Sequence, residues 1–219
     1  MLKAASLVWL FDLDNTLHDA SPHIFPHINR SMASYIREHL GVDENEATRI
    51  RQDYWQRYGA TLLGLMRHHG TDPRHFLEYT HRLPDLEHML IFEPGLKAML
   101  RRLPGRKIVF SNAPLHYSEA VLELGGIRDC FAAVYSVERL RFQPKPAIGG
   151  FRRLLHSERL PAERCIMVED SLPNLRTAKR LGMKTVWVSR ATRRPPGVDL
   201  RLVSILDLPH HLPRLQAVT

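Results

Sequence analysis

The stretch from Leu7 to Thr16 constrains the fold more than any other part of the chain. Large apolar residues run without interruption from Leu7 to Phe11, the pattern of a strand buried on both faces of a parallel sheet. The run stops at Asp12, and Asp14 follows. Ligands of open α/β sheets bind outside the carboxyl ends of the strands, so both acids lie where chemistry would be done. The alternative is an Asp- and Asn-rich turn after a core strand.

Length and composition predict an ordinary globular protein. The 219 residues suffice for one domain with a sizeable core, or for a core with an insertion. No apolar run is long enough to span a bilayer, and the acids that interrupt the first apolar run make it a poor signal peptide. Cys130 and Cys165 indicate no disulfide framework. We therefore expect a cytoplasmic protein without membrane contact.

The net charge of +8 raises the question of nucleic-acid binding. The positive charge is mostly arginine spread along the chain, with a loose late cluster at Arg190, Arg193, Arg194 and Arg201. We find no block of Lys and Arg, no zinc-finger spacing and no helix-turn-helix signature. A solvated basic surface is therefore favoured over a basic nucleic-acid-binding module, which stays as the alternative of another class. A basic cleft would also attract phosphate substrates.

The pattern of apolar and turn-forming residues over 20–92 predicts helices and no strands. An apolar stripe at helical spacing runs from Ile24 to Ile36, and glycines or an Asp-Pro pair delimit the segments that follow. Further helices are expected at 43–58, at 60–69 and from Asp72 onward. Because this block lies between the first strand and the next, we expect an inserted all-helical cap at 20–92 on a core of 1–19 and 93–219.

Strands and helices alternate after residue 93. Helical spacing is found at 96–103, 115–124, 147–157 and 171–181, and short apolar strands at 107–110, 132–135, 165–168 and 185–188. This alternation is typical of a doubly wound, Rossmann-like α/β fold with a parallel sheet. All the strands of such a sheet end at one edge.

Reactive side chains follow several of these strands. Ser111 and Asn112 come after one strand and Glu169 and Asp170 after another, while Lys145 lies between two prolines in a stiff loop. Carboxylates that gather at one edge need a cation, and oxygen ligands favour Mg²⁺. A hydroxyl, an amide and a lysine beside that ion suit a phosphoryl group. An ionised carboxylate can then attack phosphorus, while a second carboxyl works as acid and base.

Four segments resemble, in order and setting, the four motifs of the haloacid dehalogenase-like phosphatases. They are Asp12-Leu13-Asp14-Asn15-Thr16, Ser111-Asn112, Lys145-Pro146 and Glu169-Asp170, and the resemblance covers nearly the whole chain. It implies that Asp12 is the nucleophile, which becomes an aspartyl-phosphate. It also implies that Asp14 is the general acid and base, with its main-chain carbonyl on Mg²⁺. The dehalogenases of this fold lack the second acid, so Asp14 favours phosphate chemistry.

The same resemblance implies roles for the later motifs. Ser111 and Lys145 would hold the phosphoryl group. Asp170 would bind Mg²⁺, and Glu169 would bind it directly or support its ligands. One departure is Asn174, where some branches carry another acid.

A narrower resemblance points to the pyrimidine 5′-nucleotidase branch. Asn15 stands where many relatives have glycine, and the cap segment Tyr54–Gly59 and the tail segment 206–210 are also similar. This implies a small phosphorylated metabolite as substrate, a nucleoside 5′-monophosphate, contacted by Asn112, Asn15, Tyr58 and Tyr54. Tyrosines at helical spacing are more often packing residues than substrate contacts. A sugar-phosphate or phosphoglycolate phosphatase is the alternative, and the oligomeric state stays open.

Overall fold

The computed structural model describes residues 7–216 and divides the chain into two compact units. One unit comprises Met1–Asp19 with Ile91–Thr219, and the other is Ala20–Leu90. The second unit ends two residues before the boundary expected from the sequence. At this boundary the Asp19 amide donates a hydrogen bond of 2.9 Å to the Ile91 carbonyl, which joins the outgoing and returning chains on the sheet-containing unit.

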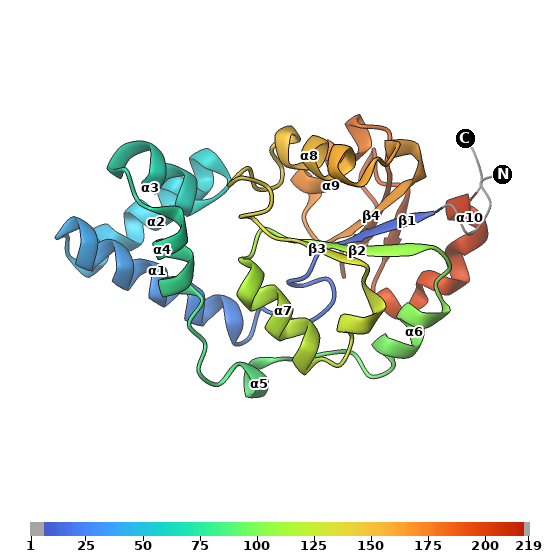
Figure 1. The fold of residues 1–219 in the computed structure, drawn as a ribbon, viewed down its shortest axis with the longest axis horizontal. Helices are drawn as coiled ribbons and strands as arrows, with labels where there is room; N and C mark the ends of the chain where they lie inside the picture. Colours follow the sequence, from blue (N-terminus) through green and yellow to red (C-terminus); the bar gives the residue numbers. More distant parts are fainter. Residues whose placement is uncertain (1–6, 217–219) are drawn as a thin grey trace. The chain divides into compact units, whose positions relative to one another are not determined.

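A parallel sheet of six strands, in the order β3-β2-β1-β4-β5-β6, organises the larger unit (Figure 1). The expected doubly wound α/β fold is thereby confirmed. The strands are β1 (Val8–Phe11), β2 (Arg106–Phe110), β3 (Ala133–Tyr135), β4 (Cys165–Glu169), β5 (Lys184–Val188) and β6 (Leu200–Leu202). Strand β6 was not expected, because three residues with an arginine in the middle give almost no sequence signal. It pairs with β5 and buries only its two leucines.

Helices cover both faces of this sheet. Helices α8 and α9 lie on one face, and α6 and α7 lie on the other, as right-handed crossovers require (Figure 1). The α-helices of this unit are α6 (Leu96–Arg102), α7 (Leu115–Leu124), α8 (Ile148–Glu158), α9 (Leu172–Arg180) and α10 (Leu212–Gln216). Short 3-10 helices are η2 (Arg128–Cys130), η3 (Ala162–Arg164) and η4 (Ile205–His211).

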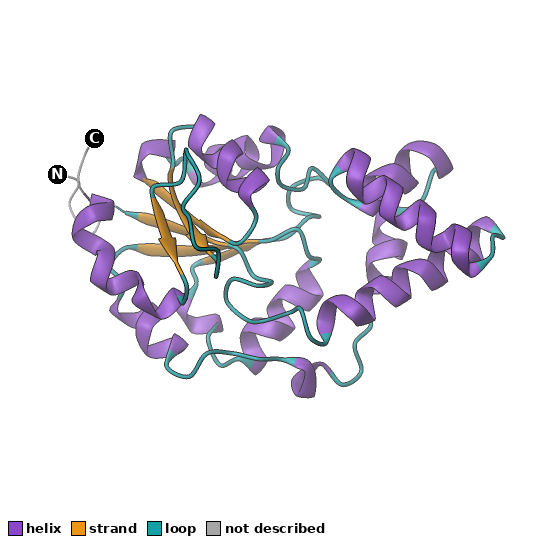
Figure 2. Cartoon of the chain, turned by 180° about the vertical axis from the view of Figure 1, so that it is seen from behind, coloured by secondary structure: helices purple, strands orange, loops and turns teal. Residues whose placement is uncertain are grey.

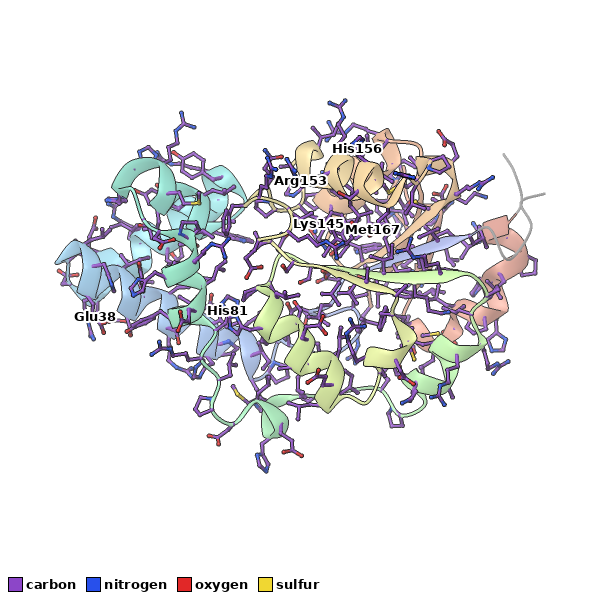
Figure 3. All side chains as sticks on the ribbon, viewed as in Figure 1. Glu38, His81, Lys145, Arg153, His156 and Met167 are labelled. Atoms are coloured by element: carbon purple, nitrogen blue, oxygen red, sulfur yellow. The ribbon has the colours of Figure 1, made fainter. Side chains whose placement is uncertain are left out.

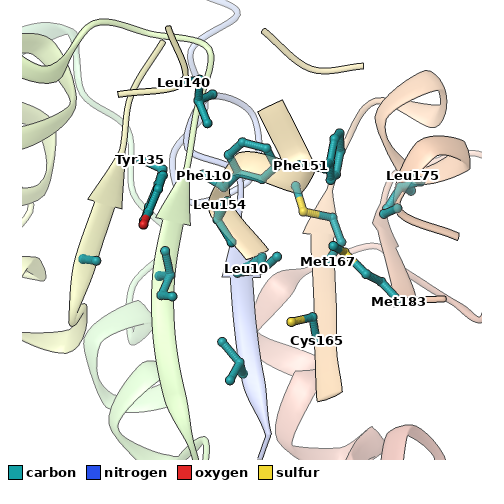
Figure 4. Packing of buried hydrophobic residues seen from close by; sticks show 14 of the residues in the cluster. Leu10, Phe110, Tyr135, Leu140, Phe151, Leu154, Cys165, Met167, Leu175 and Met183 are labelled. Atoms are coloured by element: carbon teal, nitrogen blue, oxygen red, sulfur yellow. The ribbon is translucent and has the colours of Figure 1, made fainter. Parts of the chain in front are cut away.

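The core between the sheet and α8 and α9 is made of large apolar side chains (Figure 4). Leu10 and Met167 are completely buried in the two central strands. Phe110 meets Phe151 of α8 edge to face, with ring centroids 4.9 Å apart. Burial on both faces explains why β1 reads as an uninterrupted apolar run. The same packing holds the carboxyl ends of β1, β2 and β4 in fixed positions.

The Ala20–Leu90 unit consists of helices and connecting loops (Figure 2). Its helices are α1 (Ile24–Leu40), α2 (Glu44–Tyr58), α3 (Thr61–His69), α4 (Pro73–Thr80) and α5 (Leu86–Met89). Asp43 and Asp72 cap α2 and α4 through their side chains. Helices α2 and α3 pack closely at Gly64, where a Cβ would lie 2.2 Å from the Tyr54 ring. Over residues 7–216, no helix has the length and apolar character needed to cross a membrane.

Candidate active site

Asp12 lies directly beyond β1 and is 8% exposed. Its amide donates to the Val168 carbonyl of β4 at 3.0 Å, which continues the sheet pairing by one residue and fixes the Asp12 backbone. The Thr16 hydroxyl lies 3.5 Å from Asp12 Oδ2. The carboxylate is therefore placed by the central strand of the sheet and not by a mobile turn.

Lys145 bridges two buried carboxylates. Its Nζ lies 2.7 Å from Asp12 Oδ1 and 2.6 Å from Glu169 Oε2. Lys145 and Glu169 are almost completely buried. Figure 3 labels Lys145 in the loop between β3 and α8. A buried ammonium and a buried carboxylate are each costly in isolation, so the contacts stabilise both.

Burial and neighbouring charges shift the pKa values of Asp12, Glu169, Asp170 and Lys145. Burial, reinforced by the nearby Glu169 carboxylate, raises the pKa of Asp12 to about 8, although Lys145 opposes the shift. Burial also raises the pKa of Glu169 and of Asp170. Burial lowers the pKa of Lys145, but Asp12 and Glu169 outweigh it and hold the value raised, at about 12. One lysine does not balance the surrounding carboxylates.

Asp12, Glu169 and Asp170 form a group that could hold a metal ion. One carboxylate oxygen from each lies within 4.8 Å of the others. Three negative side chains beside one lysine favour a further cation, and an all-oxygen donor set fits a hard ion such as Mg²⁺. The Trp187 indole donates to the Asp170 carbonyl at 2.7 Å, and the Ser171 amide donates to Glu169 Oε1 at 3.1 Å. These bonds hold the acids in place.

Asn112 positions Lys145. The Asn112 side-chain amide donates to the Lys145 carbonyl at 2.9 Å, and its oxygen accepts from the Lys145 amide at 2.7 Å. This pair of hydrogen bonds ties the end of β2 to the lysine loop. Both ends of the Asn112 side chain thus bind the main chain of Lys145, and its contact with substrate stays a prediction.

Asp14 is held by two side chains that lie outside the four motifs. The Tyr117 hydroxyl of α7 donates to Asp14 Oδ1 at 2.6 Å, and His18 Nε2 lies 2.9 Å from the same oxygen. The carboxylate of Asp14 lies outside the three-acid group. The binding of a metal by the Asp14 main-chain carbonyl stays a prediction.

Ser111 and Asn15 each lie directly beyond a strand end, Ser111 after β2 and Asn15 in the turn after β1. Ser111 follows β2, beside β1, and is buried, with its Oγ accepting the Ala113 amide at 3.0 Å. Asn15 adopts a left-handed backbone with φ of 60° in the turn after Asp14. Asparagine tolerates this conformation better than other residues with a side chain, which explains how it can stand where glycine is common.

Tyr54 and Tyr58 belong to the helical unit. The Tyr54 hydroxyl lies 2.8 Å from His69 Nε2, and the Tyr58 hydroxyl lies 2.6 Å from His68 Nε2. These pairs join α2 to α3. Their role towards substrate stays a prediction.

The family model for haloacid dehalogenase-like hydrolases matches residues 8–182, which include all the motif residues described above. The chain belongs to this family. A phosphoglycolate phosphatase of Rhodospirillum rubrum is 30% identical over 216 residues, which cover 90% of this chain and 86% of that protein. Phosphate metabolism protein 8 of Saccharomyces cerevisiae is 27% identical over 140 residues, which cover 59% of this chain but only 43% of the yeast protein.

Among solved structures, a haloacid dehalogenase-like phosphatase from Thermococcus onnurineus has the same fold. Its TM-score is 0.67 at 21% identity, with 96% of this chain and all of that chain covered. Its similarity supports the fold alone, whereas the family match shows a haloacid dehalogenase-like hydrolase, and the Rhodospirillum relative is named a phosphatase.

Sequence reasoning missed both Tyr117 and His18 as partners of Asp14. A faint signal was available for Tyr117, because a tyrosine on the buried side of a helix next to strand ends needs a partner for its hydroxyl. Nothing in the sequence indicates which partner it finds.

Proposed function

We propose that this chain hydrolyses phosphomonoesters through an aspartyl-phosphate on Asp12, with Mg²⁺ as its metal ion. The proposal depends chiefly on the buried contact of Asp12 with Lys145 beside Glu169 and Asp170. A carboxylate at a fixed strand end, next to a cation and a group of oxygen ligands, is arranged to attack phosphorus and to have the charge of the phosphoryl group neutralised.

The residues divide the reaction between them. An Asp12 oxygen attacks phosphorus as the bond to the leaving oxygen breaks, and Asp14 gives that oxygen a proton. Asp14 then takes a proton from the water that attacks the aspartyl-phosphate, which releases phosphate and restores Asp12. Lys145 and Ser111 hold the non-bridging oxygens. Mg²⁺ would be held by Asp12, Asp170, Glu169 and the Asp14 carbonyl, and when bound it supplies positive charge against the phosphoryl oxygens.

For the substrate we propose a nucleoside 5′-monophosphate, with pyrimidines ahead of purines. The resemblance of the first motif and of the α2 segment to pyrimidine 5′-nucleotidases supports this choice. The core motifs contact only phosphate and metal, so the helical unit, including Tyr54 and Tyr58, would supply contacts to the base. Phosphoglycolate or a sugar phosphate is the second candidate, because a relative named phosphoglycolate phosphatase aligns over 90% of this chain.

We place the enzyme in the cytoplasm, where nucleotides and other small phosphorylated metabolites are available. Both cysteines are free thiols, as in a reducing compartment. We expect the protein to bind a small phosphorylated metabolite and not a nucleic acid.

A phosphate-release panel tests the proposal. UMP, CMP, AMP, GMP, phosphoglycolate and hexose phosphates would be compared by kcat/KM, with p-nitrophenyl phosphate as the reference and Asp12→Asn as the blank. We expect activity that EDTA removes and Mg²⁺ restores, with UMP and CMP cleaved faster than the rest. A clear preference for phosphoglycolate or a hexose phosphate would overturn the nucleotide assignment and leave the phosphatase chemistry standing.

A further inference from the structure

Two buried side chains converge on one oxygen of Asp14. Tyr117 is 1% exposed and His18 is 3% exposed, and both contact Asp14 Oδ1, at 2.6 and 2.9 Å. The Tyr117 hydroxyl and His18 Nε2 lie 3.4 Å apart. Tyr117 belongs to α7, whereas Asp14 and His18 both belong to the segment after β1. The contact therefore joins two segments that are far apart in the sequence. The four motifs do not include either donor.

The hydrogen-bond chemistry identifies the donors. A carboxylate only accepts hydrogen bonds, so the Tyr117 hydroxyl donates to it. His18 Nδ1 is buried without a hydrogen-bond partner among residues 7–216. A buried N–H without a partner costs more than a bare ring nitrogen, so the network places the His18 hydrogen on Nε2, facing Asp14.

The His18 ring itself is held in place by packing. Phe92 lies against it with ring centroids 5.7 Å apart. The Phe92 ring in turn occupies the space over Gly125, where a Cβ would lie 2.4 Å from a ring atom. These residues all belong to the sheet-containing unit. The Nε2 direction is therefore set by the fold and is not a chance contact of a mobile side chain.

We infer that Tyr117 and His18 are positioning residues, which hold Asp14 by Oδ1 so that its proton is exchanged with the substrate through Oδ2. The inference rests on the proposed role of Asp14 as general acid and base. With two donors on Oδ1, the proton of the acid form is placed on Oδ2. That proton passes to the leaving oxygen as its bond to phosphorus breaks, and Oδ2 later accepts a proton from the attacking water.

The test compares leaving groups in Tyr117→Phe, which keeps the ring and removes the hydroxyl. Phosphorylation of the enzyme would be followed in single turnovers with p-nitrophenyl phosphate, whose leaving group needs no proton, and with UMP, or with another alkyl phosphate that the wild-type enzyme cleaves. We expect the alkyl phosphate to slow by about tenfold, as partial loss of a general acid would do, and p-nitrophenyl phosphate to slow much less.

Tyr135→Phe is the matched control. Tyr135 is also completely buried, and its hydroxyl donates to a Glu158 carboxylate oxygen at the same distance, 2.6 Å. Its loss should lower the melting temperature about as much as the loss of the Tyr117 hydroxyl, without dependence on the leaving group. For His18, the His18→Gln variant keeps an N–H donor and His18→Met does not, so Gln should retain more activity on the alkyl phosphate.

The outcomes separate the inference from the function on which it rests. If Asp14→Asn shows the leaving-group dependence and Tyr117→Phe does not, the positioning role is wrong and the phosphatase mechanism stands. If Asp14→Asn itself slows both substrates equally, Asp14 is not the acid and the proposed mechanism fails first. Combining Tyr117→Phe with Asp14→Asn should add no further slowing, because the phenol acts only through Asp14. Faster turnover in Tyr117→Phe would mean that the network holds Asp14 away from the substrate, and would also overturn the inference.

Discussion

Two sets of tyrosine–histidine contacts, one in each unit, differ in how far they are exposed to solvent. In the sheet-containing unit, Tyr117 and His18 are buried and meet on the Asp14 carboxylate. In the helical unit, Tyr54 and Tyr58 pair with the exposed His69 and His68. A buried polar contact is costly to break, because its groups lose water as well as each other, whereas an exposed pair can exchange with solvent. The buried network therefore fixes the geometry of Asp14, while the exposed pairs between α2 and α3 cost less free energy to break.

The ion pairs show the same contrast. Lys145 is buried between Asp12 and Glu169, whereas Arg49 and Glu46 of α2 form an exposed pair. Exposed pairs contribute about 0–1 kcal/mol to the free energy of unfolding. Removal of one partner of a buried pair is more costly, because it leaves the other charge buried without compensation. Substitutions at the strand ends should therefore have large effects, and substitutions on the helical unit small ones.

The largest effect is expected for Asp12→Asn. Turnover of every phosphomonoester should be lost, because an amide cannot attack phosphorus, while the circular dichroism spectrum stays that of the parent. The measurement is phosphate release under single-turnover conditions, with excess enzyme. Residual turnover at more than a few per cent of the parent rate would contradict the nucleophile assignment.

Lys145→Met should cost stability as well as activity. The variant leaves Asp12 and Glu169 without their buried cation, so we expect a loss of about 3 kcal/mol in the free energy of unfolding of metal-free protein. The control is Lys179→Met, which breaks an ion pair to Asp199 in which the lysine side chain is 42% exposed. It should lose no more than about 1 kcal/mol in the same urea titration. Equal losses in the two variants would show that burial does not distinguish these pairs.

The metal-free protein should lose stability as pH rises from about 4 to about 8. The pKa of Asp12 is raised from 3.8 to about 8 in the folded state. Between these values the folded protein binds more protons than the unfolded chain, so the free energy of unfolding falls with rising pH. Glu169 and Asp170 shift in the same direction. Urea titrations across this range check the trend, which should weaken in Asp12→Asn and on addition of Mg²⁺. Stability that rises through this window would refute the burial argument.

The smallest effect is expected in the helical unit. Tyr58→Ala should raise KM for nucleotides severalfold and leave turnover of p-nitrophenyl phosphate nearly unchanged, because that substrate has no base to contact. Tyr58→Phe keeps the ring and removes only the hydroxyl next to His68, so it separates stacking from hydrogen bonding. A Tyr58→Ala variant that lowers turnover of both substrates to the same degree would place Tyr58 in the packing of α2 and α3 alone.

The sequence predicted those features that depend on local pattern and chain order. The apolar run of β1 and its acids, the Pro-flanked Lys145 and the helical block after residue 20 can all be recognised locally. The contacts of Asn112 with Lys145 and of Tyr117 with Asp14 depend on how distant segments pack. No spacing rule relates position 117 to position 14, so the sequence could not indicate that a phenol would hold the second acid. Strand β6 was missed because its pairing with β5, and not its composition, makes it a strand.

The covalent intermediate on Asp12 is the most direct test of the central claim. Asp14→Asn should form the aspartyl-phosphate from p-nitrophenyl phosphate but hydrolyse it slowly, because water then lacks its base. Acid quenching after one turnover, followed by peptide mapping in a mass spectrometer, would locate the phosphoryl group. We predict a burst of p-nitrophenol close to one equivalent per enzyme and a hydroxylamine-labile phosphoryl group on Asp12. Release of p-nitrophenol with no phosphorylated peptide, or with the phosphoryl group on another residue, would contradict the mechanism.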